Sequence, residues 1–175
     1  MKKVVLVVLL LGLVVTAGCG GPKLKAPKAA GGGSLSMAVV VDRGITPDLP
    51  AERVKQYQQV GEWMERDLLN VLKKAGYTPR LVAGRNEFRG GEEGYLLTVK
   101  IVKYNPGSKA ARILVGFGAG STSLDTRYEL YGAKPQPLLA EDHGYGSSID
   151  WFKIIQKLNR EMVDAVTKKL SAAAG

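Results

Sequence analysis

The chain has 175 residues, of which 45% are hydrophobic and 23% are charged, so it can bury the core of one domain. Its only cysteine excludes an internal disulfide and a thiolate metal cluster. The formal net charge is +9, but five of the lysines precede residue 34, which leaves +4 for the remainder.

Residues 1–18 predict a signal peptide. Two lysines follow Met1, and an apolar run then extends from Val4 to Val15. This run is shorter than the roughly 20 apolar residues that a permanent membrane helix needs, and it has the length of a signal-peptide core. The protein is therefore expected to be exported.

The leader ends in Thr16-Ala17-Gly18-Cys19, with small residues before the cysteine. This pattern resembles the bacterial lipobox, in which the cysteine receives acyl chains such as palmitate and becomes the first residue of the mature protein. Thr16 departs from it, since the family usually has an aliphatic residue there. The resemblance implies lipidation of Cys19 and attachment to a membrane on the periplasmic side of the envelope. The alternative is an ordinary cleaved signal peptide with an incidental cysteine.

Gly20 follows the cysteine in place of the aspartate that resembles an inner-membrane retention signal, so the outer membrane is favoured. Residues 19–33 predict a lipidated cysteine followed by a flexible tether, because glycine, proline, alanine and lysine dominate and only Leu24 is large. This tether is expected to bury nothing. Its lysines either contact anionic lipid or are simply solvated. An exported protein rarely meets nucleic acid, so no nucleic-acid partner is expected. Anionic lipid head groups or acidic wall polymers are the expected binding partners of its positive charge.

Residues 34–175 predict a single α/β domain. Apolar runs and alternation favour strands, and apolar residues at three- and four-residue steps favour two amphipathic helices. The expected strands are 35–41, 79–83, 95–104, 124–131 and 138–143, and the expected helices are 54–75 and 151–170. Gly76 is expected to end the first helix, and Ser148 or Asp150 to cap the second. The predicted fold class is α+β, with a small, mainly antiparallel sheet and two helices packed on one of its faces.

The most conspicuous motif is Gly116-Phe117-Gly118-Ala119-Gly120. A phosphate-binding loop places such glycines between a strand and a helix, whereas here a predicted strand follows and no Gly-Lys-Ser/Thr ending is present. The pattern favours a structural role, a bulge or a close backbone contact, over ligand binding.

Arg112 and the Gly116–Gly120 stretch, after a strand ending in Tyr104-Asn105-Pro106-Gly107, resemble an uncharacterised family of bacterial envelope lipoproteins with a "GFGAG" signature. That family is classed as a domain of unknown function. The resemblance implies an envelope location and supplies no catalytic residue. Arg112, Gly116, Phe117, Gly118 and Gly120 are therefore the candidates for a binding or structural loop.

No metal site, cofactor or catalytic residue is predicted. His143 is the only histidine, and it is expected to face solvent, since adjacent strand residues point to opposite faces and no second histidine or cysteine completes a zinc site. The acidic pair Asp125 and Glu129 is expected to be solvated on an outer strand face. Trp63 lies off the apolar stripe of its helix and could mark an interface.

These observations favour a membrane-anchored, non-enzymatic interaction module of the cell envelope with an envelope-protein or cell-wall partner. One alternative is a small-ligand or nucleotide-binding domain that uses the Gly116–Gly120 loop. Another is a regulator of cell-wall synthesis, which rests only on the general layout shared with lipoproteins that activate wall synthases.

Overall fold

A computed structural model describes residues 24–29, 31–89, 94–108, 120–148 and 150–174. Five strands form one sheet in the order β2-β1-β3-β4-β5. In chain order the elements are β1 (Ser36–Asp42), α2 (Ala51–Ala75), β2 (Thr78–Leu81), the short 3₁₀ helix η1 (Arg85–Glu87), β3 (Gly94–Asn105), β4 (Thr122–Tyr131), β5 (Leu139–Ser147) and α4 (Trp151–Ala174).

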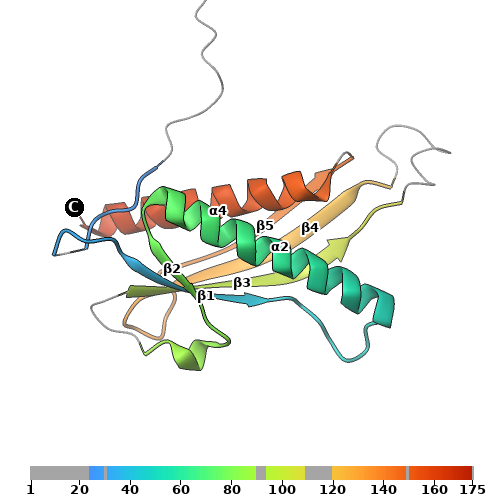
Figure 1. Ribbon diagram of the computed structural model, residues 1–175, viewed down its shortest axis with the longest axis horizontal. Coiled ribbons are helices and arrows are strands. Elements are labelled where there is room, and N and C mark those ends of the chain that lie inside the picture. The colour runs from blue at the N-terminus through green and yellow to red at the C-terminus, as the bar shows by residue number, and fades with distance from the viewer. Residues whose placement is uncertain (1–23, 30, 90–93, 109–119, 149, 175) are drawn as a thin grey trace, which may run out of the picture.

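The sheet has a parallel part and a larger antiparallel part. β1 pairs in parallel with both β2 and β3, whereas β3, β4 and β5 form an antiparallel meander. Both helices cover the same face and run in the same direction across it (Figure 1). The predicted α+β class with two helices on one face is confirmed. The parallel pairing of β1 and β2 arises because helix α2 connects them, which returns the chain to the same edge of the sheet.

The helix boundaries follow local chemistry. Gly76 adopts a left-handed conformation with φ of 103°, and its N–H donates to the carbonyls of Leu72 and Lys73, as expected for a glycine that ends a helix. The Asp150 carboxylate accepts a hydrogen bond from the backbone N–H of Phe152 at 3.0 Å, which satisfies a free amide at the start of α4. Both predicted helix-end residues are therefore confirmed.

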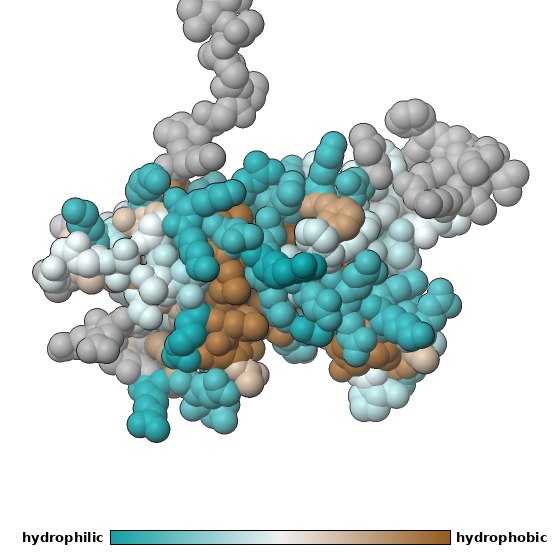
Figure 2. Space-filling view, viewed as in Figure 1, coloured by the Kyte–Doolittle hydropathy of each residue, from teal (hydrophilic) through white to brown (hydrophobic). Residues whose placement is uncertain are grey.

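The main core lies between the helices and the sheet. Alternation along β1 and β3 turns Met37, Val39, Leu97, Val99 and Ile101 toward the helices, where they are fully buried. The helices contribute their apolar stripes, which include Met64, Leu68, Leu72, Ile154, Ile155, Leu158, Met162 and Val166. Figure 2 shows that the outer surface of α2 is mostly hydrophilic, as an amphipathic helix requires.

The opposite face of the sheet is covered only in part. A small cluster of Ala38, Val82, Leu96 and Tyr131 forms there, with Val40 and Phe88 packed against it. η1 lies on this side of the sheet, away from the helices (Figure 1). Beyond this cluster, polar side chains of β1, β3, β4 and β5 occupy the face. We call this region the open face and define it by Asp42, Thr98, Lys100, Arg127, Glu129 and Asp142.

Part of the predicted tether contacts the domain. The N–H of Ala26 donates to the carbonyl of Ala75 at 2.8 Å, and Ala26 packs against the main core. Lys28 and Ser34 form an isolated antiparallel bridge. These contacts differ from the expectation that the whole tether buries nothing. The physical reason is that the last carbonyls of a helix lack partners within the helix, so a passing backbone N–H can bond one of them.

Candidate functional site

Of the predicted glycine loop, the structure describes only the last residue, Gly120. Cys19, Arg112, Gly116, Phe117 and Gly118 lie outside the described residues. Gly120 is described, two residues before the start of β4, and its φ of +66° is one that favours glycine.

The stem of the β3–β4 connection is held by a close backbone approach. Gly107 has φ of +73°, and a Cβ atom at this position would lie 2.4 Å from the carbonyl oxygen of Gly120. The N–H of Ser108 donates to that same oxygen at 2.9 Å, and the Thr122 hydroxyl donates to the Pro106 carbonyl at 2.9 Å. At this end of the connection, the glycines therefore permit two strands to approach closely.

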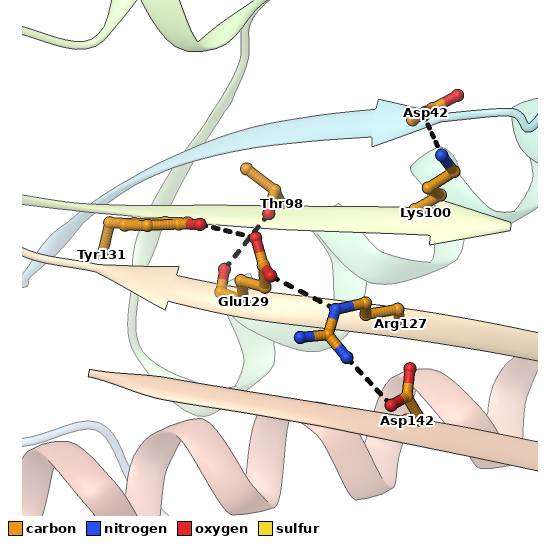
Figure 3. A network of polar contacts seen from close by, with 7 residues as sticks. All are labelled: Asp42, Thr98, Lys100, Arg127, Glu129, Tyr131 and Asp142. Carbon is orange, nitrogen blue, oxygen red and sulfur yellow. Dashed lines mark hydrogen bonds and ion pairs between the residues drawn. The ribbon is translucent and has the colours of Figure 1, made fainter. Parts of the chain in front are cut away.

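The open face carries an ordered network of charges, shown in Figure 3. The Arg127 guanidinium forms ion pairs with Glu129 at 3.2 Å and with Asp142 at 2.9 Å. Register places Arg127 directly opposite Asp142 on β5, and alternation places Glu129 two residues along the same face of β4. Farther along the sheet, Lys100 and Asp42 form a looser pair at 3.7 Å.

Glu129 is the most constrained member of this network. Its carboxylate accepts a hydrogen bond from the Tyr131 hydroxyl as well as from Arg127. The Tyr131 bond, followed by the bond from Arg127, holds the pKa of Glu129 below its ordinary value. Burial, followed by the bond to Glu129, raises the pKa of Tyr131, and the Arg85 guanidinium stacks 3.9 Å from the centre of the Tyr131 ring. Both hydrogen bonds therefore favour the ionised form of Glu129 and hold its carboxylate in a fixed position.

The expectation that Glu129 is merely solvated is wrong. Its side chain is 24% exposed and has two side-chain partners. The sequence alone could have predicted the pairing of Arg127 with Glu129, because residues two apart on a strand lie on the same face. The third member of the network, Asp142, could not be predicted without the register between β4 and β5.

A second polar cluster lies on the helix side of β5. Tyr128 is fully buried and donates a hydrogen bond of 2.5 Å to Glu141, which also lies 3.1 Å from Nε2 of His143. Nδ1 of His143 lies 3.8 Å from Glu161 of α4. Burial, followed by the bond to Glu141, raises the pKa of Tyr128.

The prediction of a solvent-facing histidine is therefore wrong. The His143 side chain is 28% exposed, and its ring lies 5.2 Å from that of Tyr128. His143 and Glu141 are two residues apart on a strand, so they share the face that meets α4. Among the described residues, no group of three histidine, cysteine or acidic side chains is placed to hold a metal ion.

Trp63 packs against the beginning of α4. Its ring lies edge-on to Phe152 at 4.5 Å and to Trp151 at 6.3 Å, and the Arg66 guanidinium lies 4.4 Å from its centre. Although 37% of Trp63 is exposed, the residue joins the two helices. Across the described part of the chain, no helix is both long enough and apolar enough to span a membrane.

The fold and its open face define a small α+β domain in which two helices cover one side of a five-stranded sheet and polar side chains occupy much of the other. The chain belongs to the family described as domain of unknown function DUF4410, whose profile matches residues 42–174. No relative was found among curated proteins.

The fold is similar to that of the solved structures of PelC. The PelC dodecamer from Paraburkholderia phytofirmans has 14% sequence identity and a TM-score of 0.51, over 84% of this chain and 92% of that chain. A point variant of the same PelC dodecamer gives 14% identity and a TM-score of 0.51, over 78% and 90%. A putative neuraminyllactose-binding hemagglutinin homolog from Helicobacter pylori gives 12% identity and a TM-score of 0.35, over 86% and 88%.

Proposed function

We propose that this protein is a lipid-anchored, non-enzymatic interaction module of the bacterial cell envelope. The observation that carries the proposal is the open face of the sheet, where Arg127, Glu129 and Asp142 form one continuous ion-paired network. This network presents both signs of charge in fixed positions on a broad surface of regular strands. Such a surface suits recognition of a protein partner with complementary charges.

The energetics of the network favour recognition over stability. Asp142 is 69% exposed and Arg127 is 44% exposed, and exposed ion pairs typically contribute less than about 1 kcal/mol to folding. The same groups interact more strongly once a partner excludes water from them. Their side chains are already ordered by mutual contacts, so binding loses less conformational entropy. Arg127 is the natural centre of the surface because arginine is enriched among residues that dominate binding energy.

The anchor is the second part of the proposal. The leader and the small residues before Cys19 support lipidation at that residue, with the domain on the periplasmic side of a membrane. The absence of an aspartate after Cys19 favours the outer membrane. Attachment there would confine the domain to a thin layer at the membrane surface, which raises the effective concentration of partners in the same layer.

Self-association is a specific form of the same function. PelC, which shares the fold, is a dodecamer, and this supports a proposal that the partner is another copy of this chain. Light scattering coupled to size-exclusion chromatography tests it on the purified lipoprotein in detergent. A defined oligomer that Arg127→Gln dissociates would place the contact on the open face. A monomer at all concentrations would exclude self-association.

The test of the main proposal is cross-linking in cells followed by capture of the lipoprotein and mass spectrometry. We expect one envelope protein to be enriched with the native chain and depleted about tenfold or more with Arg127→Gln. Lys55→Gln is the matched control, because it removes the same charge from the exposed surface of α2. An enzyme of wall synthesis among the captured proteins would assign a regulatory role. Equal capture by native protein and Arg127→Gln would refute the open face as the binding surface.

A further inference from the structure

We propose that the end of the helical layer at which the chain enters the domain lies against the membrane and binds anionic lipid head groups. We call this surface the basic end and define it by Lys25, Lys73 and Lys74. The inference rests on the proposed lipid anchor and adds a second membrane contact, made by the folded domain itself.

The path of the chain places the basic end near the anchor. Leu24 lines a groove between α2 and α4 together with Val71 and Val163. Two residues later, Ala26 bonds the last carbonyl of α2, that of Ala75. Both helices end on the side of the molecule at which this first described segment lies (Figure 1).

The length of the connection sets a limit on distance. Four residues separate Cys19 from Leu24, so the connection spans at most about 18 Å when fully extended. A free coil from Cys19 to residue 33 would allow the domain to turn in any direction, but the contacts at Leu24 and Ala26 remove most of that freedom. A domain anchored at Cys19 must therefore keep the ends of α2 and α4 close to the head groups.

The charge at this place matches an anionic surface. All three cations are exposed, and none of them forms an ion pair with a described carboxylate. Arg160 of α4, which lines the groove beside Leu24 and Lys74, is likewise exposed and has no ion pair with a described carboxylate. Asp67 and Asp164 line the same groove, so the cations remain in excess. Lys28 adds one more exposed positive charge on the entering segment.

The open face differs in this respect. There Arg127 and Lys100 are paired with carboxylates. Three cations without an ion pair among the described residues, Arg85, Arg89 and Lys134, lie around Tyr131, on the side of the sheet away from the helices. Lysines near an anionic membrane each strengthen binding by a factor of about five. Because only the basic end combines unpaired cations with the chain segment that leads to Cys19, the proposed orientation has the basic end toward the membrane and the open face directed away from it.

The experiment uses the mature lipoprotein reconstituted in vesicles with and without phosphatidylglycerol, in a phosphatidylcholine background. Lipidation occupies the only native thiol, so a single introduced cysteine gives a unique labelling site. Ser171→Cys places a fluorophore on the last turn of α4, and Val102→Cys places one on exposed β3. A nitroxide on the lipid head groups quenches whichever label lies close to them.

We expect the Ser171→Cys label to be quenched much more strongly than the Val102→Cys label, and only when phosphatidylglycerol is present. Lys73→Gln with Lys74→Gln should lower the orientation equilibrium constant about 25-fold. The matched control is Lys55→Gln with Lys103→Gln, which removes the same charge elsewhere and should leave the quenching unchanged.

Four results would overturn the proposal. Equal quenching of the two labels in an acylated protein would show that the domain has no preferred orientation. Strong Ser171→Cys quenching that neither lipid composition nor the lysine substitutions change would show that chain length alone holds the domain there. Loss of quenching on addition of a soluble anionic polysaccharide would assign the basic end to a wall polymer. Absence of an acyl group on Cys19, seen by mass spectrometry, would refute the anchor itself.

Discussion

At the scale of single residues, neighbouring side chains on the open face hold one carboxylate in a fixed position. Glu129 is held by Tyr131 and Arg127, and its pKa lies below the ordinary value because the Tyr131 hydroxyl, first of all, stabilises the ionised form. A carboxylate whose pKa is lowered on folding contributes stability above its ordinary pKa and loses that contribution as the pH falls.

Tyr131→Phe should raise the pKa of Glu129 toward its ordinary value, because the strongest hydrogen bond to the carboxylate is removed. Titration of the Glu129 carboxyl carbon by NMR measures the change directly. The variant should also lose less stability between neutral pH and pH 3 than the native protein. Tyr145→Phe, at an exposed tyrosine of β5, is the control. An unchanged Glu129 titration would show that Arg127 alone sets the pKa.

Gly107→Ala tests the stem of the β3–β4 connection. An alanine there must adopt a left-handed conformation and bring its Cβ within 2.4 Å of a backbone oxygen. We expect a loss of about 2–3 kcal/mol in the free energy of unfolding, measured with urea. Gly33→Ala, where no atom lies within 4 Å of the added Cβ, should change it by less than about 0.5 kcal/mol. Similar losses in both variants would contradict the close approach.

At the scale of elements, a fully buried polar side chain lies at the interface between α2 and α4. Asn159 is fully buried, and its amide nitrogen donates to Asp67 at 2.9 Å and to the Met64 carbonyl at 3.3 Å. Its side-chain oxygen finds no donor among the described residues. A buried acceptor without a partner costs stability. Asn159 therefore weakens the packing of α4 against α2, although its hydrogen bonds fix how the two helices lie.

Asn159→Leu should therefore raise the free energy of unfolding by about 1 kcal/mol, because leucine has the same branched heavy-atom skeleton and leaves no buried polar oxygen. Asn159→Asp is the contrasting variant. It places a second carboxylate beside Asp67 and should destabilise the domain by at least as much. Urea denaturation measures both. A destabilised leucine variant would mean that the bond to Asp67 outweighs the unpaired oxygen.

At the scale of the whole molecule, the two sides of the sheet differ in burial and polarity. The helices close one side and hold nearly all of the core, while the other side keeps an ordered polar surface. The proposed anchor and the basic end would direct the open face away from the membrane, toward partners in the periplasm.

Cys19→Ala tests the anchor on which this arrangement depends. We expect the variant to accumulate as a precursor with its leader attached and without acyl chains, because lipidation at the cysteine precedes cleavage in bacterial lipoproteins. Mass spectrometry of the N-terminal peptide measures both outcomes. Thr16→Leu, which restores the usual lipobox residue, should be processed at least as well as the native chain. Cleavage of Cys19→Ala before residue 19 would contradict the assignment.

Much of the secondary structure could be predicted because it depends on local chemistry. Apolar periodicity marked both helices, Gly76 and Asp150 marked a helix end and a helix start, and alternation marked the long strands. The surroundings of His143 could not be predicted in the same way. Its neighbours Tyr128 and Glu161 come from other elements, and only their packing brings them within reach.

The α+β class and the two helices on one face follow from the residue pattern alone, because a helix stripe and a strand face must each bury their apolar side chains. The leader and Cys19 also predict where the protein resides. Contacts between distant segments set the parallel pairing of β1, the register that puts Arg127 opposite Asp142, and the contact of Ala26 with the end of α2. These features depend on backbone hydrogen bonds between distant segments, and such bonds leave no periodic trace in the residues that make them.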